Sequence, residues 1–223
     1  MGTIKNLNMG SMNPVNIIKC IKYNRDYKKL HPLEFGASGI SVYCGKQGSG
    51  KTLSAVNYCK NLLDIYPNCK FVTNTIVNGL NDDIEVIPYS TETLWSVNND
   101  EFGVLYLIDE MHLEFNSLNS KNIPDSIFTE VAQQRKQRKH IVGTSQVFER
   151  LAKPFREQID TFYMCHTFLK YIQILDVYDG SSISSLDGQV SKDMAIDKLI
   201  FFHSPSMYLS YDTYFKIKGV NND

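Results

Sequence analysis

The feature that most constrains this chain is a glycine-rich segment of eight residues. Residues 45–52 read Gly-Lys-Gln-Gly-Ser-Gly-Lys-Thr and match the pattern G-x-x-x-x-G-K-[ST] at every position. The preceding residues, 40–44, are apolar and β-branched, which predicts a buried strand. The following residues, 52–65, carry apolar side chains at helical spacing until Pro67, which predicts a helix. A strand, a glycine-rich turn and a helix in this order are the setting that phosphate binding requires.

The chemistry of phosphate binding explains each residue type in the loop. The backbone N–H groups must wrap a triphosphate, so side chains have to be absent at Gly45 and Gly50. Lys51 is expected to reach the β- and γ-phosphates, and the Thr52 hydroxyl to bind Mg²⁺. The helix that follows points its positive end at the phosphates. The predicted nucleotide-binding set is Gly45, Lys46, Gln47, Gly48, Ser49, Gly50, Lys51 and Thr52.

Two neighbouring acids follow the most apolar segment of the chain. Residues 104–108 are continuously apolar, as expected of a strand buried on both faces, and Asp109 and Glu110 come directly after them. The end of such a strand lies at the same sheet edge as the phosphate loop. We therefore expect Asp109 to hold Mg²⁺ and Glu110 to orient or deprotonate an attacking water. An adjacent glutamate favours a hydrolysing ATPase over a kinase or a nucleotide switch.

The rest of the chain predicts an α/β fold. Strands alternating with helices favour a P-loop NTPase (ASCE/RecA-like) with a mostly parallel central sheet flanked by helices. We expect an N-terminal lead-in segment over 1–39 and a P-loop ATPase domain over 40–223, with its core at about 40–165 and C-terminal strands and a helix in 166–223. Further strands are expected over 70–74, 84–87, 140–144, 160–165, 171–177 and 199–202, helices over 91–97 and 125–138, a loop over 181–191, and a closing helix that carries Tyr208, Tyr211 and Tyr214.

Composition limits the class of protein. The 223 residues carry 23 Lys+Arg and 24 Asp+Glu, a net charge of −1, so a protein that coats nucleic acid with its whole surface is not expected. Five cysteines form no C-x-x-C pair and are odd in number, which indicates reduced thiols in a cytoplasmic protein and neither a zinc site nor a disulfide framework. The sequence contains no run of about 18 apolar residues, so we expect no transmembrane helix.

Polar and basic residues follow the later strands. Gln146, after the strand 140–144, is placed to contact the γ-phosphate or the attacking water. His112 is expected to be a structural hydrogen-bonding residue. The densest basic run, 133–140, is either a solvated helix end, a DNA phosphate contact, or a source of an arginine that acts on a neighbour's nucleotide. Its DNA-contact candidates are Arg135, Lys136, Arg138 and Lys139, while Arg150 and Arg156 are candidates for an arginine finger.

The order of these motifs resembles the FtsK/HerA superfamily of ring-forming translocase ATPases. Within it, the chain looks most like the Zot-like (zonular occludens toxin-like) assembly ATPases of filamentous phages. The resemblance covers residues 40–165 and rests on the phosphate loop, Leu-Ile-Asp-Glu-Met-His-Leu-Glu-Phe at 107–115, the basic run, Ile-Val-Gly-Thr-Ser-Gln at 141–146, and Phe-Arg-Glu-Gln-Ile-Asp at 155–160. Carried over, Lys51 and Thr52 match Walker A, Asp109 and Glu110 match Walker B, Gln146 matches the polar sensor, and Arg156 the arginine that serves an adjacent subunit.

The resemblance implies ATP and Mg²⁺ as cofactors and a hexameric homo-oligomer that moves DNA during virion assembly or extrusion. It implies location in the cytoplasm of a bacterial host, with membrane association through a membrane-embedded assembly partner. Zot-like proteins usually continue into a membrane-spanning helix, and these 223 residues contain no such segment. Short genome-packaging ATPases of tailless viruses, with a capsid partner, belong to the same superfamily, so packaging is the alternative. A P-loop kinase or switch is a further alternative.

Overall fold

The computed structural model describes residues 15–116, 125–185 and 192–211. By its internal contacts the chain divides into two compact units, Met1–Glu34 and Phe35–Asp223. In the first unit, α1 (Val15–Leu30) is a helix in which no residue is buried. Among the described residues, no helix combines the length and the apolarity needed to cross a membrane.

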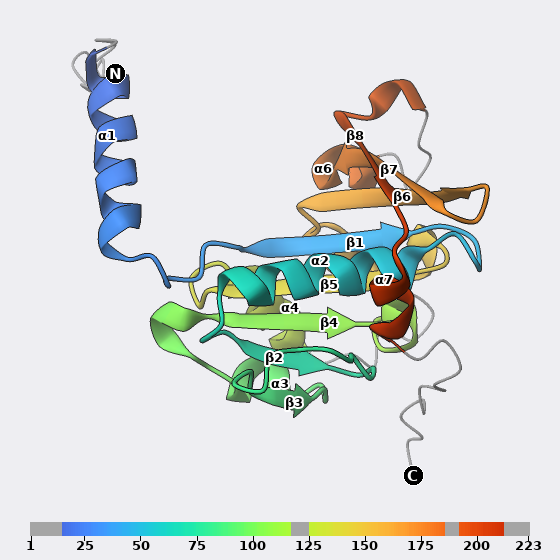
Figure 1. Ribbon diagram of the computed structural model, residues 1–223, viewed down its shortest axis with the longest axis horizontal. Coiled ribbons are helices and arrows are strands. Elements are labelled where there is room, and N and C mark those ends of the chain that lie inside the picture. Colours follow the sequence, from blue (N-terminus) through green and yellow to red (C-terminus); the bar gives the residue numbers. More distant parts are fainter. Residues whose placement is uncertain (1–14, 117–124, 186–191, 212–223) are drawn as a thin grey trace, which may run out of the picture. The chain divides into compact units, whose positions relative to one another are not determined.

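The second unit is built on a mixed sheet of eight strands in the order β3-β2-β4-β5-β1-β6-β7-β8 (Figure 1). All pairs from β3 to β6 are parallel, whereas β6–β7 and β7–β8 are antiparallel. The predicted α/β class with a mostly parallel sheet is therefore confirmed. The strands are β1 (Gly39–Cys44), β2 (Lys70–Thr73), β3 (Val86–Pro88), β4 (Val104–Ile108), β5 (Lys139–Ser145), β6 (Thr161–Phe168), β7 (Ile172–Asp179) and β8 (Asp197–Phe202).

Helices cover both faces of the parallel strands. The longest helix of this unit, α2 (Lys51–Ile65), lies in front of the sheet in Figure 1, and α4 (Asp125–Gln133) lies behind it. The short elements are α3 (Thr93–Ser96), α5 (Lys153–Arg156), α6 (Gly180–Ser185) and α7 (Pro205–Leu209), with single 3₁₀ turns at Asp100–Phe102, Met111–Leu113, Phe148–Arg150 and Lys192–Met194.

Strand β4 shows how one apolar run serves two cores. All five of its residues are buried, and successive side chains point to opposite faces. Leu105 and Leu107 belong to the core that includes α2, whereas Tyr106 and Ile108 belong to the core that includes Phe155 of α5. A strand that is covered on both faces therefore needs apolar residues at successive positions, without the alternation of polar and apolar residues seen in half-exposed strands.

Three predicted elements differ from the structure. The helix predicted over 125–138 ends at Gln133, and its last five residues form turns that lead into β5. Within the predicted loop 181–191, residues up to Ser185 belong to α6, and the rest lies outside the described residues. The closing helix α7 contains Tyr208 but not Tyr211, which forms a β-bridge with Val77; Tyr214 lies outside the described residues.

Candidate functional site

The site lies at the carboxyl edge of the parallel strands. Strands β1, β4 and β5 run in the same direction and are neighbours or next neighbours in the sheet. The residues that follow their last positions are the phosphate loop, the pair Asp109–Glu110, and Gln146. Parallel pairing therefore gathers three sequence motifs that are separated by up to a hundred residues.

The loop backbone uses glycine where the sequence pattern demands it. Gly45 and Gly50 have φ values of 147° and 80°, a region that residues with a side chain rarely adopt. A Cβ added to Gly45 would lie 2.8 Å from the carbonyl oxygen of Cys165, and one added to Gly50 would collide with Oε1 of Gln173. Both positions therefore require glycine for its backbone freedom and for space.

The first two residues of α2 point into the loop. Lys51 is buried, and its Nζ donates a hydrogen bond to the carbonyl oxygen of Lys46, 3.2 Å away. The Thr52 hydroxyl donates to Oδ1 of Asp109 at 2.9 Å. The predicted metal-binding pair is thus brought together across 57 residues of sequence. A hydroxyl and a carboxylate are oxygen donors of the type Mg²⁺ prefers, so both residues fit the predicted ion.

Asp109 is held by residues that the sequence analysis did not assign to the site. The Thr144 hydroxyl, at the end of β5, donates to Oδ1 of Asp109 at 2.6 Å. Asn74, just beyond β2, clamps the backbone on both sides: its Nδ2 donates to the carbonyl oxygen of Asp109 at 2.9 Å, and its Oδ1 accepts from the Asp109 N–H at 2.8 Å. The only signal for either residue was a polar side chain at a strand end.

Glu110 occupies a strained position beside Gln146. Its φ of 50° is left-handed, which is uncommon for a residue with a side chain and is typical of functional positions. Its N–H donates to the Thr144 hydroxyl at 2.9 Å. One carboxylate oxygen, Oε1, accepts from Nε2 of Gln146 at 3.2 Å, and the other, Oε2, lies 3.2 Å from Nδ1 of His112. Among the described residues, only the Gln146 contact is a hydrogen bond, and Oε2 is buried without a hydrogen-bond partner.

His112 is buried, as its predicted structural role requires. Burial is the main influence on its pKa, which it lowers below the usual 6.5, while the nearby Glu110 carboxylate opposes this shift. The ring also lies 3.5 Å from the hydroxyl of Ser145. His112 therefore packs beside Glu110 without forming a hydrogen bond to its carboxylate.

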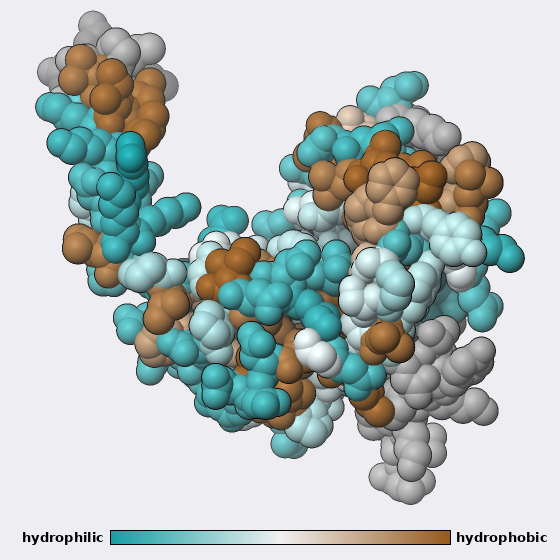
Figure 2. Space-filling view, viewed as in Figure 1, coloured by the Kyte–Doolittle hydropathy of each residue, from teal (hydrophilic) through white to brown (hydrophobic). Residues whose placement is uncertain are grey.

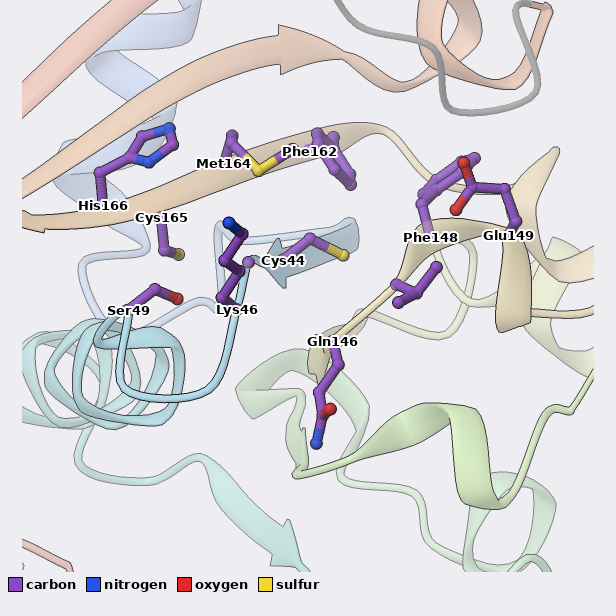
Figure 3. Close-up of a pocket in the computed structure, with 12 residues that line it drawn as sticks. Cys44, Lys46, Ser49, Gln146, Phe148, Glu149, Phe162, Met164, Cys165 and His166 are labelled. Carbon is purple, nitrogen blue, oxygen red and sulfur yellow. The ribbon is translucent and has the colours of Figure 1, made fainter.

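A cavity of about 450 Å³ opens beside the loop. Figure 3 shows Lys46 and Ser49 of the loop on one side and Gln146 and Phe148 across from them. Strand β6 also lines the cavity, through Met164 and neighbouring residues. The cavity joins the phosphate loop to the Gln146 segment, and its volume lies within the range of small-molecule sites.

The basic run lies at the opposite edge of the sheet. Arg135 and Lys136 are exposed in the turn that precedes β5, and Arg138 is half-buried. Seven-residue β5 separates this turn from Thr144 and the site by about 20 Å. These side chains therefore do not reach the phosphate loop of their own chain.

Lys139 corrects the predicted DNA-contact set. It is 3 % exposed, and its Nζ donates to the carbonyl oxygen of Leu94 at 2.5 Å and to Glu130 at 3.3 Å. It occupies the first position of β5, where the sheet is covered by α3 and α4. A buried, paired ammonium cannot contact DNA, so Lys139 is removed from the set.

Arg156 remains a prediction as an arginine finger. It ends α5 and is half-buried, with its guanidinium carbon 5.5 Å from the centre of the Phe148 ring. Phe148 lines the cavity beside the phosphate loop. Arg150, the other candidate, is exposed at the end of the adjacent 3₁₀ turn.

Comparison with known proteins gives structural matches. A scan against protein-family models found no match, and a search of curated proteins found none. Among solved structures, the N-terminal domain of zonular occludens toxin from Neisseria meningitidis matches with a TM-score of 0.54 and 14% identity, covering 79% of this chain and 100% of that one.

A second match is the genome packaging NTPase B204 of Sulfolobus turreted icosahedral virus 2. In complex with AMPPCP it matches with a TM-score of 0.51 and 15% identity, covering 75% of this chain and 98% of that one. In complex with AMP the values are 0.50 and 16%, covering 65% and 94%. The chain therefore shares the fold of these proteins, the P-loop NTPase fold that its sequence predicts.

Proposed function

We propose that this protein is a Mg²⁺-dependent ATPase. The observation that carries the proposal is the Glu110 carboxylate, which accepts a hydrogen bond from Gln146 and stands one residue after Asp109, itself in contact with Thr52. A carboxylate at this position favours a hydrolysing ATPase over a kinase or a nucleotide switch. The packaging NTPase with the same fold was solved with AMP and AMPPCP, which supports an adenine nucleotide as ligand.

Each residue has a role that its position supports. The loop N–H groups and Lys51 bind the phosphates, and Thr52 and Asp109 hold Mg²⁺. The bound metal supplies charge neutralisation on the phosphate oxygens. Glu110 accepts a proton from the attacking water. Gln146 orients the Glu110 carboxylate through its hydrogen bond. Arg156 of a neighbouring copy is the proposed source of further positive charge.

We further propose that ATP hydrolysis drives DNA movement by a homo-oligomeric ring in phage assembly or extrusion. Support comes from the shared fold with the zonular occludens toxin domain and from the order of motifs in the sequence. The proposed DNA contacts are Arg135, Lys136 and Arg138, at the sheet edge away from the nucleotide. A membrane-embedded assembly partner and a bacterial host cytoplasm belong to the same proposal.

Genome packaging is the second candidate. The specific observation in its favour is the likeness to a virus packaging NTPase, which the chain matches over 75% of its length. Both candidates use the same nucleotide site. They differ in the DNA that is moved and in whether the partner is a membrane assembly or a capsid.

ATP turnover with and without single- and double-stranded DNA tests the proposal, with Lys51→Ala as the control. We expect turnover that rises with DNA and vanishes in the control. A preference for single-stranded DNA would favour extrusion, and a preference for double-stranded DNA would favour packaging. No turnover under any of these conditions would contradict the ATPase assignment, and turnover indifferent to DNA would contradict the motor.

A further inference from the structure

Gln173 contacts the phosphate loop from outside the ATPase core of the sheet. It lies near the start of β7 in the antiparallel part, and its side chain is 0% exposed. Its Nε2 donates to the carbonyl oxygen of Ser49 at 2.9 Å. Its Oε1 accepts from the Thr167 hydroxyl at 3.0 Å and lies 3.1 Å from Nε2 of His203.

The direction of this amide follows from its partners. A carbonyl oxygen can only accept, so the atom that faces Ser49 must be the NH₂ group. The amide oxygen then faces Thr167 and His203, and both can donate to it. All of the partners are satisfied in one orientation, which is the condition for a buried polar side chain to be well ordered.

The hydrogen-bond chain continues beyond His203. Nδ1 of the neutral His203 ring lies 2.7 Å from the Tyr208 hydroxyl and accepts its proton when Nε2 donates to Gln173; the same hydroxyl oxygen lies 3.1 Å from the carbonyl oxygen of Lys170, and its single proton serves one of these two acceptors. Lys170 belongs to the turn between β6 and β7, and Tyr208 belongs to α7. The antiparallel strands and the last described helix are thus linked through Gln173 to the loop.

The position of the Gln173 contact matters because of peptide geometry. The carbonyl of Ser49 and the N–H of Gly50 belong to one planar trans peptide, so they point in opposite directions. A hydrogen bond that fixes the carbonyl therefore also fixes the N–H. Gly50 packs so closely on the Gln173 amide that an added Cβ would collide with it. The Gln173 amide thus fixes the direction of the Gly50 N–H, one of the backbone N–H groups that form a phosphate-binding loop.

We propose that Gln173 is a positioning residue of the phosphate loop, which directs the Gly50 N–H toward the bound phosphates and makes nucleotide affinity depend on the antiparallel strands. This inference rests on the proposed function as a nucleotide-binding enzyme. Gln173 touches no phosphate itself. Its effect on nucleotide passes through the Ser49–Gly50 peptide.

The test is the affinity of the purified protein for a fluorescent, non-hydrolysable ATP analogue with Mg²⁺. Gln173→Leu removes the donor to Ser49, and we expect the Kd to rise about tenfold, the effect of one lost hydrogen bond. Gln173→Glu keeps the size of the side chain and its bonds to Thr167 and His203 but sets a carboxylate against the Ser49 carbonyl. We expect a rise at least as large.

A matched control separates positioning from folding. Val177 lies four residues along the same strand, on the same face, and is buried away from the loop. Val177→Ala should lower the thermal midpoint of the nucleotide-free protein without changing the Kd. If the leucine variant does not fold, the glutamate variant decides. A Kd within twofold of wild type in a folded Gln173 variant would overturn the proposal.

Turnover is measured separately on the same proteins. Because Glu110 and Gln146 follow other strands, β4 and β5, we expect the Gln173 variants to raise KM more than they lower kcat. A wild type that binds the analogue but turns over no ATP would contradict the proposed ATPase and leave the Gln173 test intact. A wild type that does not bind the analogue would overturn both.

Discussion

The central parallel strands β4 and β5 and the antiparallel edge strand β8 are buried to very different extents. Every residue of β4 and β5 is buried, whereas Leu199, Ile200 and Phe202 of β8 are 43%, 59% and 75% exposed. The antiparallel strands appear at the upper right of Figure 1, and Figure 2 shows apolar side chains exposed in the same region. Helices α2 and α4 cover opposite faces of the central parallel strands.

The two parts of the sheet also contribute differently to the candidate site. The doubly covered strands end together at one edge, where Asp109, Glu110 and Gln146 meet. The antiparallel strands contribute no proposed catalytic residue, yet Gln173 holds the loop that binds phosphate. The parallel part therefore supplies the chemistry, and the antiparallel part supplies support from the side.

The largest expected effect tests the chemical half of this comparison. Glu110→Gln keeps the shape of the side chain but removes the base, so we expect turnover to fall about 10³-fold. Nucleotide affinity should stay near that of wild type, the reverse of the pattern expected for Gln173→Leu. Steady-state turnover and analogue binding measure both. Unchanged turnover would remove Glu110 from the base role.

The second effect tests the difference in burial. Leu105→Ala, in fully buried β4, should lower the free energy of unfolding by about 3 kcal/mol, because it leaves a cavity in a core that cannot collapse fully. Ile200→Ala, on exposed β8, should cost less than about 1 kcal/mol. Urea unfolding of both variants checks the pair. Equal costs would show that β8 is covered in solution.

The third effect concerns DNA. Arg135→Gln with Lys136→Gln removes two exposed charges at the amino edge of the parallel strands, and we expect DNA affinity to fall severalfold with a shallower salt dependence. The control, Lys170→Gln, removes one exposed charge from the antiparallel part and should change little. Binding titrations at several salt concentrations compare them. Equal losses would show that DNA contact is not localised at this turn.

The smallest effect concerns pH. Burial lowers the pKa of His140 in β5 below the usual 6.5, where its ring contacts the Tyr58 hydroxyl and the carbonyl oxygen of Gly39. As pH falls below 6.5, the unfolded chain binds a proton there before the folded protein does, so the free energy of unfolding should decrease, by at most about 1.4 kcal/mol per pH unit.

His203, in the antiparallel part, also has a pKa lowered by burial, but it is half-buried and should contribute less. Unfolding measured from pH 7 to 5 in wild type, His140→Gln and His203→Gln tests this order. The slope should flatten more in the His140 variant. A larger change in the His203 variant would contradict the assigned difference in burial.

The sequence by itself determined the local elements that carry the chemistry. The loop residues 45–52, the helix after them, strand β4 and the two acids at its end all follow from patterns a few residues long. Apolar periodicity and glycine placement are local properties, because they reflect the backbone conformation and burial of neighbouring residues. The predicted helix over 125–138 overshot because basic residues fit a helix end and a turn equally well.

Only the tertiary structure decided which distant residues meet. Asn74 clamps Asp109 across 35 residues, and Gln173 holds Ser49 across 124. Of the four residues proposed to contact DNA, Lys139 alone is buried. The order of the strands in the sheet and the antiparallel pairing of β6, β7 and β8 determine these contacts. A single sequence carries no local signal for either, since a hydrogen bond between strands depends on register and neighbours that chain-local patterns do not encode.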